Sequence, residues 1–377
     1  MDPYFVTLIY ICLALLLVVL SMLLIIIYMR LAIDRKESDY LAKAALWEGW
    51  YLPYVQNEAT LKETAALFRE EKNYNLLWRF FAPYFNFLKG EDFEETRELC
   101  KEIGLIAYYQ ADLQLGAAGT RAKAASVLGT LHCKRSIEPM LTMLKSDDRL
   151  LVQAAAQGLA KSDQPETFGA VAKTLLNNTY FTYEGITEIL VGYGPEICDF
   201  IVGQLGEEVN RLNETYEQTE TALESKKKGP ADIHPSAYLA IMVNLLGHFR
   251  HREALPVLGE LLPLADEETS VQILKTLLRI GELPDGFDLL KCLDHPHWVM
   301  RNFGAKLFPK AKTEQSVDPL IRLLKDNHWW VRFNAAEALL RAGDNGRAAL
   351  EKAAAGSDDD PAAVISRYIL KKGGDMS

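Results

Sequence analysis

The feature that most constrains the fold of this chain is an apolar position that recurs with a constant 31-residue period. The segment 323–344 places its apolar side chains on one face of a helix, and Leu339 lies on that face. Steps of one period in both directions reach further apolar residues in two series, which are Leu128, Leu159 and Leu190, and Leu246, Leu277, Phe308, Leu339 and Leu370. Such repetition predicts a stack of similar helical units rather than one compact core.

A shorter apolar segment precedes many of these helices, so the repeating unit is predicted to be a helical hairpin. Examples are the segments 136–145, 253–262 and 316–325, each with a proline near its start, where the missing N–H is no loss. The two series are out of phase, because the interval from Leu190 to Leu246 is longer than one period and shorter than two. We assign the excess to an insertion at 206–233.

The residues that carry the pattern resemble HEAT repeats of the short type found in phycobilin lyases. The run from Asp326 to Leu339 reads D-x(4)-V-R-x-x-A-A-x-A-L, and Arg121 to Leu128 echoes it. The resemblance implies an all-α fold with an α-solenoid of about eight or nine hairpins over residues 116–377. It says almost nothing about chemistry, because the alanines serve to let helices approach closely.

A second strong feature is an uncharged apolar segment at the start of the chain. Residues 3–29 contain no charged side chain, and as a helix they would extend roughly 40 Å, more than the roughly 30 Å of bilayer hydrocarbon. A cleaved signal peptide, the alternative, needs a basic start, a shorter apolar core and a small-residue cleavage site. The sequence has none of these, so we expect residues 1–33 to be a retained transmembrane anchor.

The flanking charges predict the orientation of this anchor. Asp2 precedes it, whereas four basic residues follow it, which are Arg30, Arg35, Lys36 and Lys43. Because positive flanks stay in the cytoplasm, we expect a single-pass protein of the cell membrane with its N-terminus outside and its repeats inside. Residues 34–115 are aromatic-rich and helical in pattern, and we expect a membrane-proximal cap of divergent repeats or, alternatively, a separate adaptor bundle.

Composition and motifs argue against several functional classes. The 41 Lys and Arg residues against 51 Asp and Glu give a net charge of −10, which opposes wholesale binding of nucleic acid. The 5 cysteines are dispersed and are interpreted as reduced thiols. HExxH, GxSxG and Walker motifs are missing from the sequence, so we expect no catalytic residue, no cofactor and no metal.

The cluster of Cys292, Asp294, His295 and His297 invites a metal-site interpretation. Pro296 marks its segment as an inter-helix turn, however, and no second pair of ligands is evident.

The pairs His297-Trp298 and His328-Trp329 are one period apart, and we expect them to seal the junctions between repeats rather than to hold a ligand.

The first candidate interaction surface is a set of basic side chains that we call the cation column. A basic or titratable residue lies two positions after most of the recurring apolar residues, and two further lysines lie one turn earlier. Such cations also complement the helix dipole, so a structural role is the alternative to binding an acidic partner segment or another anionic ligand. The column comprises Lys161, His248, Lys275, Arg279, Lys306, Lys310, Arg341 and Lys372.

The insertion is the second candidate surface. It contains five residues that are three and four positions apart, as in a short heptad seam, and they are Val209, Leu212, Tyr216, Thr219 and Leu223. Three alternatives remain open for this segment. It could be an exposed arm that recruits a partner helix, an extended repeat helix that packs on the solenoid, or a disordered loop.

These predictions describe a non-enzymatic scaffold that is tethered to the membrane through residues 3–29 and recruits an acidic or helical protein partner, without nucleic acid. Resemblance to membrane-tethered bacterial HEAT proteins implies service to a membrane glycosyltransferase or a secretion assembly. The alternative function is a HEAT-like lyase or other enzyme that acts on a ligand in the concave groove. A DNA-binding solenoid is opposed by the anchor and by the acidity.

Overall fold

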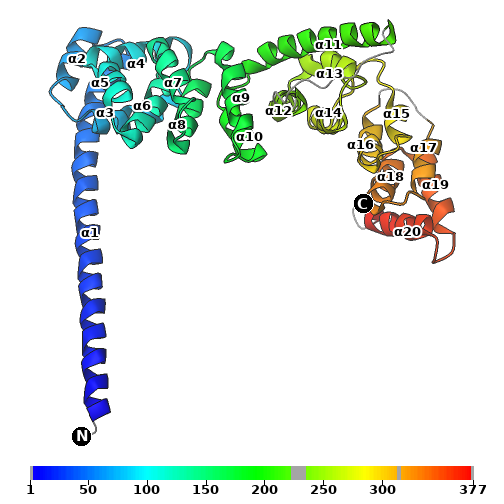
Figure 1. The fold of residues 1–377 in the computed structure, drawn as a ribbon, viewed down its shortest axis with the longest axis horizontal. Helices are drawn as coiled ribbons and strands as arrows, with labels where there is room; N and C mark the ends of the chain where they lie inside the picture. The colour runs from blue at the N-terminus through cyan, green and yellow to red at the C-terminus, as the bar shows by residue number, and fades with distance from the viewer. Residues whose placement is uncertain (1–2, 222–234, 312–315, 375–377) are drawn as a thin grey trace. The chain divides into compact units, whose positions relative to one another are not determined.

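In a computed structural model of the chain, the described residues are 3–221, 235–311 and 316–374. They form the α-helices α1 to α20 and four short 3₁₀ helices, and these ranges contain no strand (Figure 1). The chain divides into two compact units, Met1–Ser136 and Ile137–Ser377. We call them unit 1 and unit 2 and describe each by itself.

Unit 1 is built on one long helix. α1 runs without a break from Pro3 to Val55, which corresponds to about 80 Å at 1.5 Å per residue. Its portion from Leu15 onward is long and apolar enough to cross a membrane, and the most apolar part of it is not buried within the structure. The helix continues past residue 33, where the predicted anchor ends, because no Gly or Pro interrupts residues 30–48.

The last turns of α1 enter the core of unit 1. Trp47 and Tyr51 are each only 2% exposed, and the residues that face the unit recur at helical spacing along α1. Nearer the apolar run, the guanidinium of Arg79 donates to both carboxylate oxygens of Glu37 at 2.6 and 2.7 Å. A further ion pair joins Lys43 to Glu71. One face of α1 is therefore fixed to the rest of the unit.

Five shorter helices complete unit 1. A capping box between Thr60 and Glu63 starts the first of them. Gly104, with φ of 93°, makes the sharp turn between the third and the fourth. The helices are α2 (Leu61–Phe68), α3 (Tyr74–Phe85), α4 (Gly90–Ile103), α5 (Leu105–Leu115) and α6 (Ala118–Thr130).

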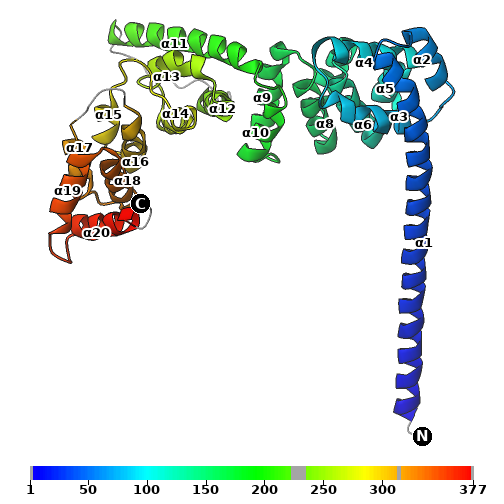
Figure 2. The ribbon, with the colours of Figure 1, turned by 180° about the vertical axis from the view of Figure 1, so that it is seen from behind.

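Unit 2 is a succession of helical hairpins with a solenoid-like arrangement. From α8 to α20, each even-numbered helix packs on the next even-numbered one (Figures 1 and 2). The first seven helices are α7 (Ile137–Met143), α8 (Arg149–Ala160), α9 (Phe168–Asn177), α10 (Tyr183–Val191), α11 (Ile197–Thr221), α12 (Pro235–His248) and α13 (Leu255–Leu261). The others are α14 (Glu267–Ile280), α15 (Leu289–Leu293), α16 (Trp298–Leu307), α17 (Asp318–Leu323), α18 (Trp329–Arg341), α19 (Asp344–Ala354) and α20 (Pro361–Gly374).

The recurring apolar residues lie near the ends of the even-numbered helices α6 to α20. All of them are buried except Leu370, which is half-buried while its neighbour Ile369 is 1% exposed. The helices also approach closely at small residues. A Cβ atom on Gly247 of α12 would lie 2.7 Å from Thr276 Oγ1 of α14, so any other residue at this contact would require a local shift.

Candidate functional site

The signature that suggested HEAT repeats has a structural role. Arg332 Nη1 donates to the carbonyl oxygens of Asp326 and Asn327 at 2.7 and 3.2 Å, and so holds the turn before its own helix. Arg301 Nη1 does the same one repeat earlier, with the carbonyl oxygens of His295 and Pro296 at 2.8 and 2.7 Å. The arginine at this position of the motif therefore holds the turn in these two hairpins.

Arg301 also connects its repeat to the next one. Its Nε and Nη2 donate to the carboxylate of Asp326 at 2.6 and 3.1 Å, and the Asp326 side chain is 6% exposed. Burial alone would raise the pKa of Asp326, but the hydrogen bonds from Arg301 and from the backbone amide of His328 outweigh it and lower the pKa below its usual value. This buried pair fastens α16 to the turn before α18.

Several residues of the segment that invited a metal-site interpretation have other partners. His297 Nδ1 lies 2.9 Å from Glu267 Oε1, and Asp294 pairs with Arg322 at 3.0 Å. Cys292 is 3% exposed, and burial raises the pKa of its thiol to about 11. Nowhere in the described part of the chain do three or more His, Cys, Asp or Glu residues form a group that could hold a metal ion.

The two His-Trp pairs differ in their surroundings. Trp298 stacks on His328 with ring centroids 4.8 Å apart, as a junction seal would. Trp329 is 46% exposed, and its neighbour Trp330 is 55% exposed. Trp329 lines one hollow with Val364 and Tyr368 of α20, which are 51% and 55% exposed. Since Trp330 contacts Trp329, the four side chains form an apolar surface patch of the kind found at protein interfaces. The sequence pattern did not separate the sealing tryptophan from the exposed ones.

The cation column divides into two parts, although all eight side chains are exposed. At its C-terminal end, Arg341 and Lys372 share the carboxylate of Glu337, at 3.8 and 3.2 Å. The other residues of the column, from Lys161 to Lys310, form no ion pair with any carboxylate among the residues that the structure describes. The dipole at each helix end stabilises a cation there, but it does not provide a side chain as an ion-pair partner.

Three residues of the unpaired part line one groove. His248 of α12 and Lys275 and Arg279 of α14 face a hollow of about 760 Å³ between α10, α12 and α14. Arg250, in the turn after α12, contributes a further cation. Glu184 and Glu188 of α10 form the opposite wall. The sequence predicted the cations, but it did not predict Arg250 or the acidic wall, because neither follows the 31-residue spacing.

The insertion extends a repeat helix in the described part. α11 continues from Ile197 to Thr221 and packs along α12 and α13. Val209 is 3% exposed and Leu212 is half-buried, so the start of the predicted seam faces unit 2. The side chains of Tyr216 and Thr219 lie outside the described part, as does the whole of Leu223.

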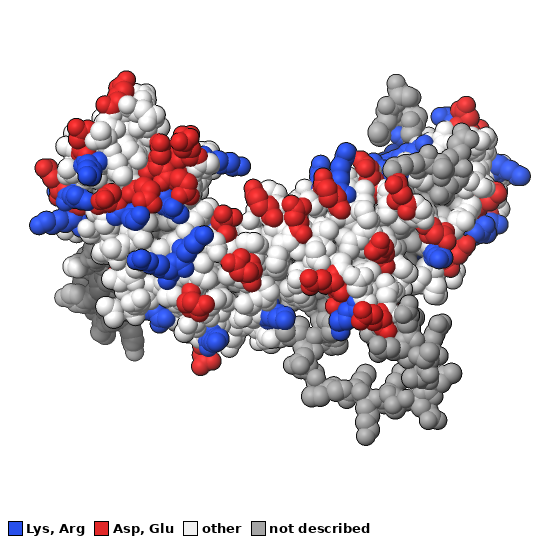
Figure 3. Space-filling view, turned by 90° about the horizontal axis from the view of Figure 1, so that it is seen from above, with Lys and Arg blue, Asp and Glu red and all other residues white. Residues whose placement is uncertain are grey.

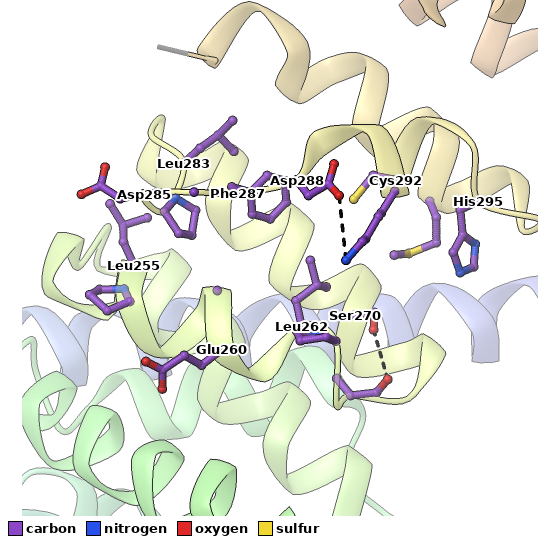
Figure 4. Close-up of a pocket in the computed structure, with 18 of the residues that line it drawn as sticks. Leu255, Glu260, Leu262, Ser270, Leu283, Asp285, Phe287, Asp288, Cys292 and His295 are labelled. Atoms are coloured by element: carbon purple, nitrogen blue, oxygen red, sulfur yellow. Dashed lines mark hydrogen bonds and ion pairs between the residues drawn. The ribbon is translucent and has the colours of Figure 1, made fainter. Parts of the chain in front are cut away.

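A second cavity opens on the side of the odd-numbered helices, where α15 has only 5 residues (Figure 4). It has a volume of about 1140 Å³ and lies between α13, the segment 281–288 and the beginning of α16. Leu255, Leu262 and Phe287 line it with apolar surface, and Lys291 Nζ lies 3.8 Å from Asp288 Oδ2 at its edge. Its polar groups do not converge on one point.

On the face that Figure 3 presents, charge is mixed rather than segregated. Figure 3 shows Lys and Arg side chains interspersed with Asp and Glu over the face that it presents. Broad single-sign fields of the type that steer nucleic acids are not visible on that face.

The fold and these surfaces define a helical-repeat protein whose exposed grooves suit protein contacts. Residues 288–367, from the start of α15 into α20, match the family model of HEAT repeats. No curated protein matches the chain. The match and the all-helical structure of the described residues support a HEAT-repeat protein, and HEAT repeats suggest an interaction scaffold.

Proposed function

We propose that this protein is a non-enzymatic scaffold that is tethered to the cell membrane by α1 and recruits a protein partner at the cytoplasmic face. α1 would be the single-pass anchor, with its N-terminus outside and the helices from α2 to α20 in the cytoplasm. Residues 116–377 would form a HEAT-like solenoid of the short type with a 31-residue period. We propose that it serves a membrane glycosyltransferase or a secretion assembly.

The exposure of α1 is the observation that carries this proposal. Leu15, Leu17 and Leu24 are 60%, 69% and 66% exposed, and nearly all large apolar side chains from Leu13 to Ile33 are exposed in the same way. Leaving such a run in water costs on the order of tens of kcal/mol compared with burying it. A bilayer would cover this surface, and the same helix continues directly into the core of unit 1.

Membrane fractionation of the full-length chain tests the anchor. We expect the protein to stay in the membrane pellet after alkaline carbonate extraction, and a C-terminal tag to be protected from protease added outside the cell. A full-length variant with Leu17→Arg and Leu24→Arg should be released, because each arginine at the centre of a spanning helix costs about 2.5–3.5 kcal/mol. Release of the unchanged protein, or a mature chain that starts after residue 29, would contradict the proposal.

The scaffold part of the proposal is tested by affinity capture from solubilised membranes. We expect a specific protein partner that is retained by the full-length chain. A partner that dissociates after Lys310→Glu and Arg341→Glu would bind through the cation column. Purified protein that carries a chromophore or a metal would instead favour an enzyme or a lyase.

A further inference from the structure

The groove between α10, α12 and α14 contains cations that have no ion-pair partner in the described part of the chain. Lys275 and Arg279 lie one turn apart on α14, and His248 and Arg250 reach the groove from the end of α12. No ion-pair partner within the described ranges is found for Lys275, Arg279 or Arg250. The chain as a whole nevertheless has a net charge of −10. Acidic residues are thus abundant, yet none of those described lies within ion-pair distance of these three cations.

A hydrogen-bond network orients Arg279 within this groove. Asn244, which is 8% exposed, accepts from Arg279 Nη1 at 2.7 Å and from Gln272 Nε2 at 3.0 Å through its Oδ1. Its Nδ2 donates to Thr187 Oγ1 at 3.1 Å. Because only Nη1 of Arg279 is engaged by the described residues, its Nε and Nη2 remain available. These two N–H groups form the edge of a guanidinium that binds a carboxylate with two parallel hydrogen bonds.

A buried hydroxyl supplies another donor beside this arginine. Tyr183 Oη is shielded from solvent and has no hydrogen-bond partner among the groups that the structure describes. Burial raises the pKa of Tyr183 to about 12, while nearby Arg279 lowers it. A neutral phenol with an unused O–H is costly to leave unpaired. Tyr183 lines the same groove as Glu184, but because its Oη is shielded, it would donate to a ligand only after a local rearrangement.

The opposite wall restricts the class of ligand. Glu184 and Glu188 line the same groove as the cations. They would repel the densely charged surface of an anionic membrane or a nucleic acid. An extended peptide tolerates them, because it can present an acidic side chain to one wall and a basic side chain or backbone N–H groups to the other. The volume of about 760 Å³ is in the range of known ligand sites.

We propose that this groove binds an acidic peptide segment of a partner protein, with one carboxylate held by Arg279 and Lys275 and with Glu184 and Glu188 facing the next part of the peptide. The inference rests on the proposed scaffold function and deepens it, since it names the chemistry of the partner and the place where it binds. In this site Asn244 is a positioning residue, because it acts through Arg279.

Fluorescence anisotropy with full-length protein in a nonionic detergent tests the inference. The probes are a fluorescein-labelled peptide of alternating Glu and Ser and the same peptide with Gln in place of Glu. We expect the Glu peptide to bind more tightly, with a Kd that rises as salt is added. Arg279→Gln should raise that Kd about tenfold, and Lys275→Gln should raise it severalfold. Both side chains are exposed, so the variants should fold.

Arg347→Gln is the matched control. Arg347 is an exposed arginine of α19, away from the groove, and it pairs with Glu351 at 3.2 Å. We expect this variant to change the Kd less than twofold. Equal weakening by Arg347→Gln, equal binding of the Gln peptide, or displacement of the Glu peptide by vesicles of anionic lipid or by inorganic phosphate at lower concentration than by unlabelled Glu peptide would each overturn the proposal.

The outcome is separable from that of the membrane experiment. A captured partner whose binding survives both Arg279→Gln and Lys275→Gln would overturn this inference and leave the tethered scaffold standing. Arg279-dependent binding of the Glu peptide by a chain that carbonate releases from membranes would support the groove and overturn the tether.

Discussion

The two units differ in how their interiors are filled. In unit 1, the ring of Tyr51 contacts those of Phe80, Phe81 and Tyr84 with centroids 4.8–6.1 Å apart, mostly edge to face. In unit 2, the contacts between even-numbered helices are made largely by leucines and alanines, such as the fully buried Ala335 and Ala336. Large rings fill an irregular space once, whereas small residues allow the same close contact to be repeated.

This difference explains why the period can be read throughout unit 2, whereas in unit 1 it is represented only by Leu128 of α6. A stack of equivalent contacts demands similar residues at equal spacing, and Leu277 and Leu339 show that spacing. A single aromatic cluster places no such demand on the sequence. Its residues come from α1, α2 and α3 at positions that packing alone determines.

The largest expected effect comes from opening the aromatic core. Phe81 is fully buried and contacts Phe68 and Tyr51. Phe81→Ala should lower the free energy of unfolding of unit 1 by about 3–5 kcal/mol, because the cavity left behind cannot be filled. Phe87→Ala is the control, since Phe87 is 83% exposed and should change stability by less than about 0.5 kcal/mol. Hydrogen exchange followed by mass spectrometry would localise the loss.

The distinction between the units fails if both lose protection together. If Phe81→Ala accelerated hydrogen exchange in peptides of unit 2 as much as in those of unit 1, the two units would unfold as one, whatever fills their interiors.

A smaller effect is expected from the buried pair between repeats. Asp326→Asn keeps the shape but removes the charge that Arg301 binds, and should cost about 2–3 kcal/mol at neutral pH, measured by urea denaturation. Asp294→Asn is the control, because Asp294 and Arg322 are both about 60% exposed.

The same pair predicts a pH dependence. The pKa of Asp326 is lowered in the folded state from 3.8, so its stabilisation is fully present above that pH and is lost as the pH falls through the lower folded-state pKa. The Asp326→Asn variant should lack this part of the acid sensitivity. Identical acid titrations of stability for the two proteins would show that the pair contributes nothing.

The smallest effect concerns close approach. Gly247→Ala places a methyl group against Thr276 and should destabilise unit 2 by about 1–2 kcal/mol, less than the larger cost of overpacking because alanine favours the helix. Gly203→Ala in α11 is the matched control. A Cβ atom there would meet nothing within 4 Å, so this change should stabilise by about 0.5–1 kcal/mol. Thermal melts that shift in the same direction would contradict the close packing of α12 on α14.

The sequence predicted the helices better than it predicted their partners. The apolar face of α18 and the basic residues near helix ends follow from spacing alone, because each depends on one helix. Whether a cation is paired depends on neighbouring helices. Glu337 engages Arg341 and Lys372, whereas Lys275 has no such neighbour among the described residues. No spacing rule carries that information.

The groove was missed as a unit for the same reason. Tyr183, Asn244 and Gln272 come from three helices and have no common interval in the sequence. Buried polar residues such as Asn244 could have been flagged, since they sit where the pattern demands apolar side chains. The continuation of α1 past residue 33 was also readable, because charge marks a membrane boundary but does not end a helix.

Because α1 is unbroken, the number of residues between its apolar run and the rest of unit 1 determines the direction in which unit 1 faces. Each residue of a helix turns the next part of the chain by about 100° and advances it by about 1.5 Å. Between the apolar run and the ion pair of Glu37 with Arg79 there is no break where such a rotation could be absorbed. One residue added near position 33 would therefore turn unit 1 by about a quarter of a revolution relative to the apolar run, whereas seven would restore its bearing and raise it by about 10 Å.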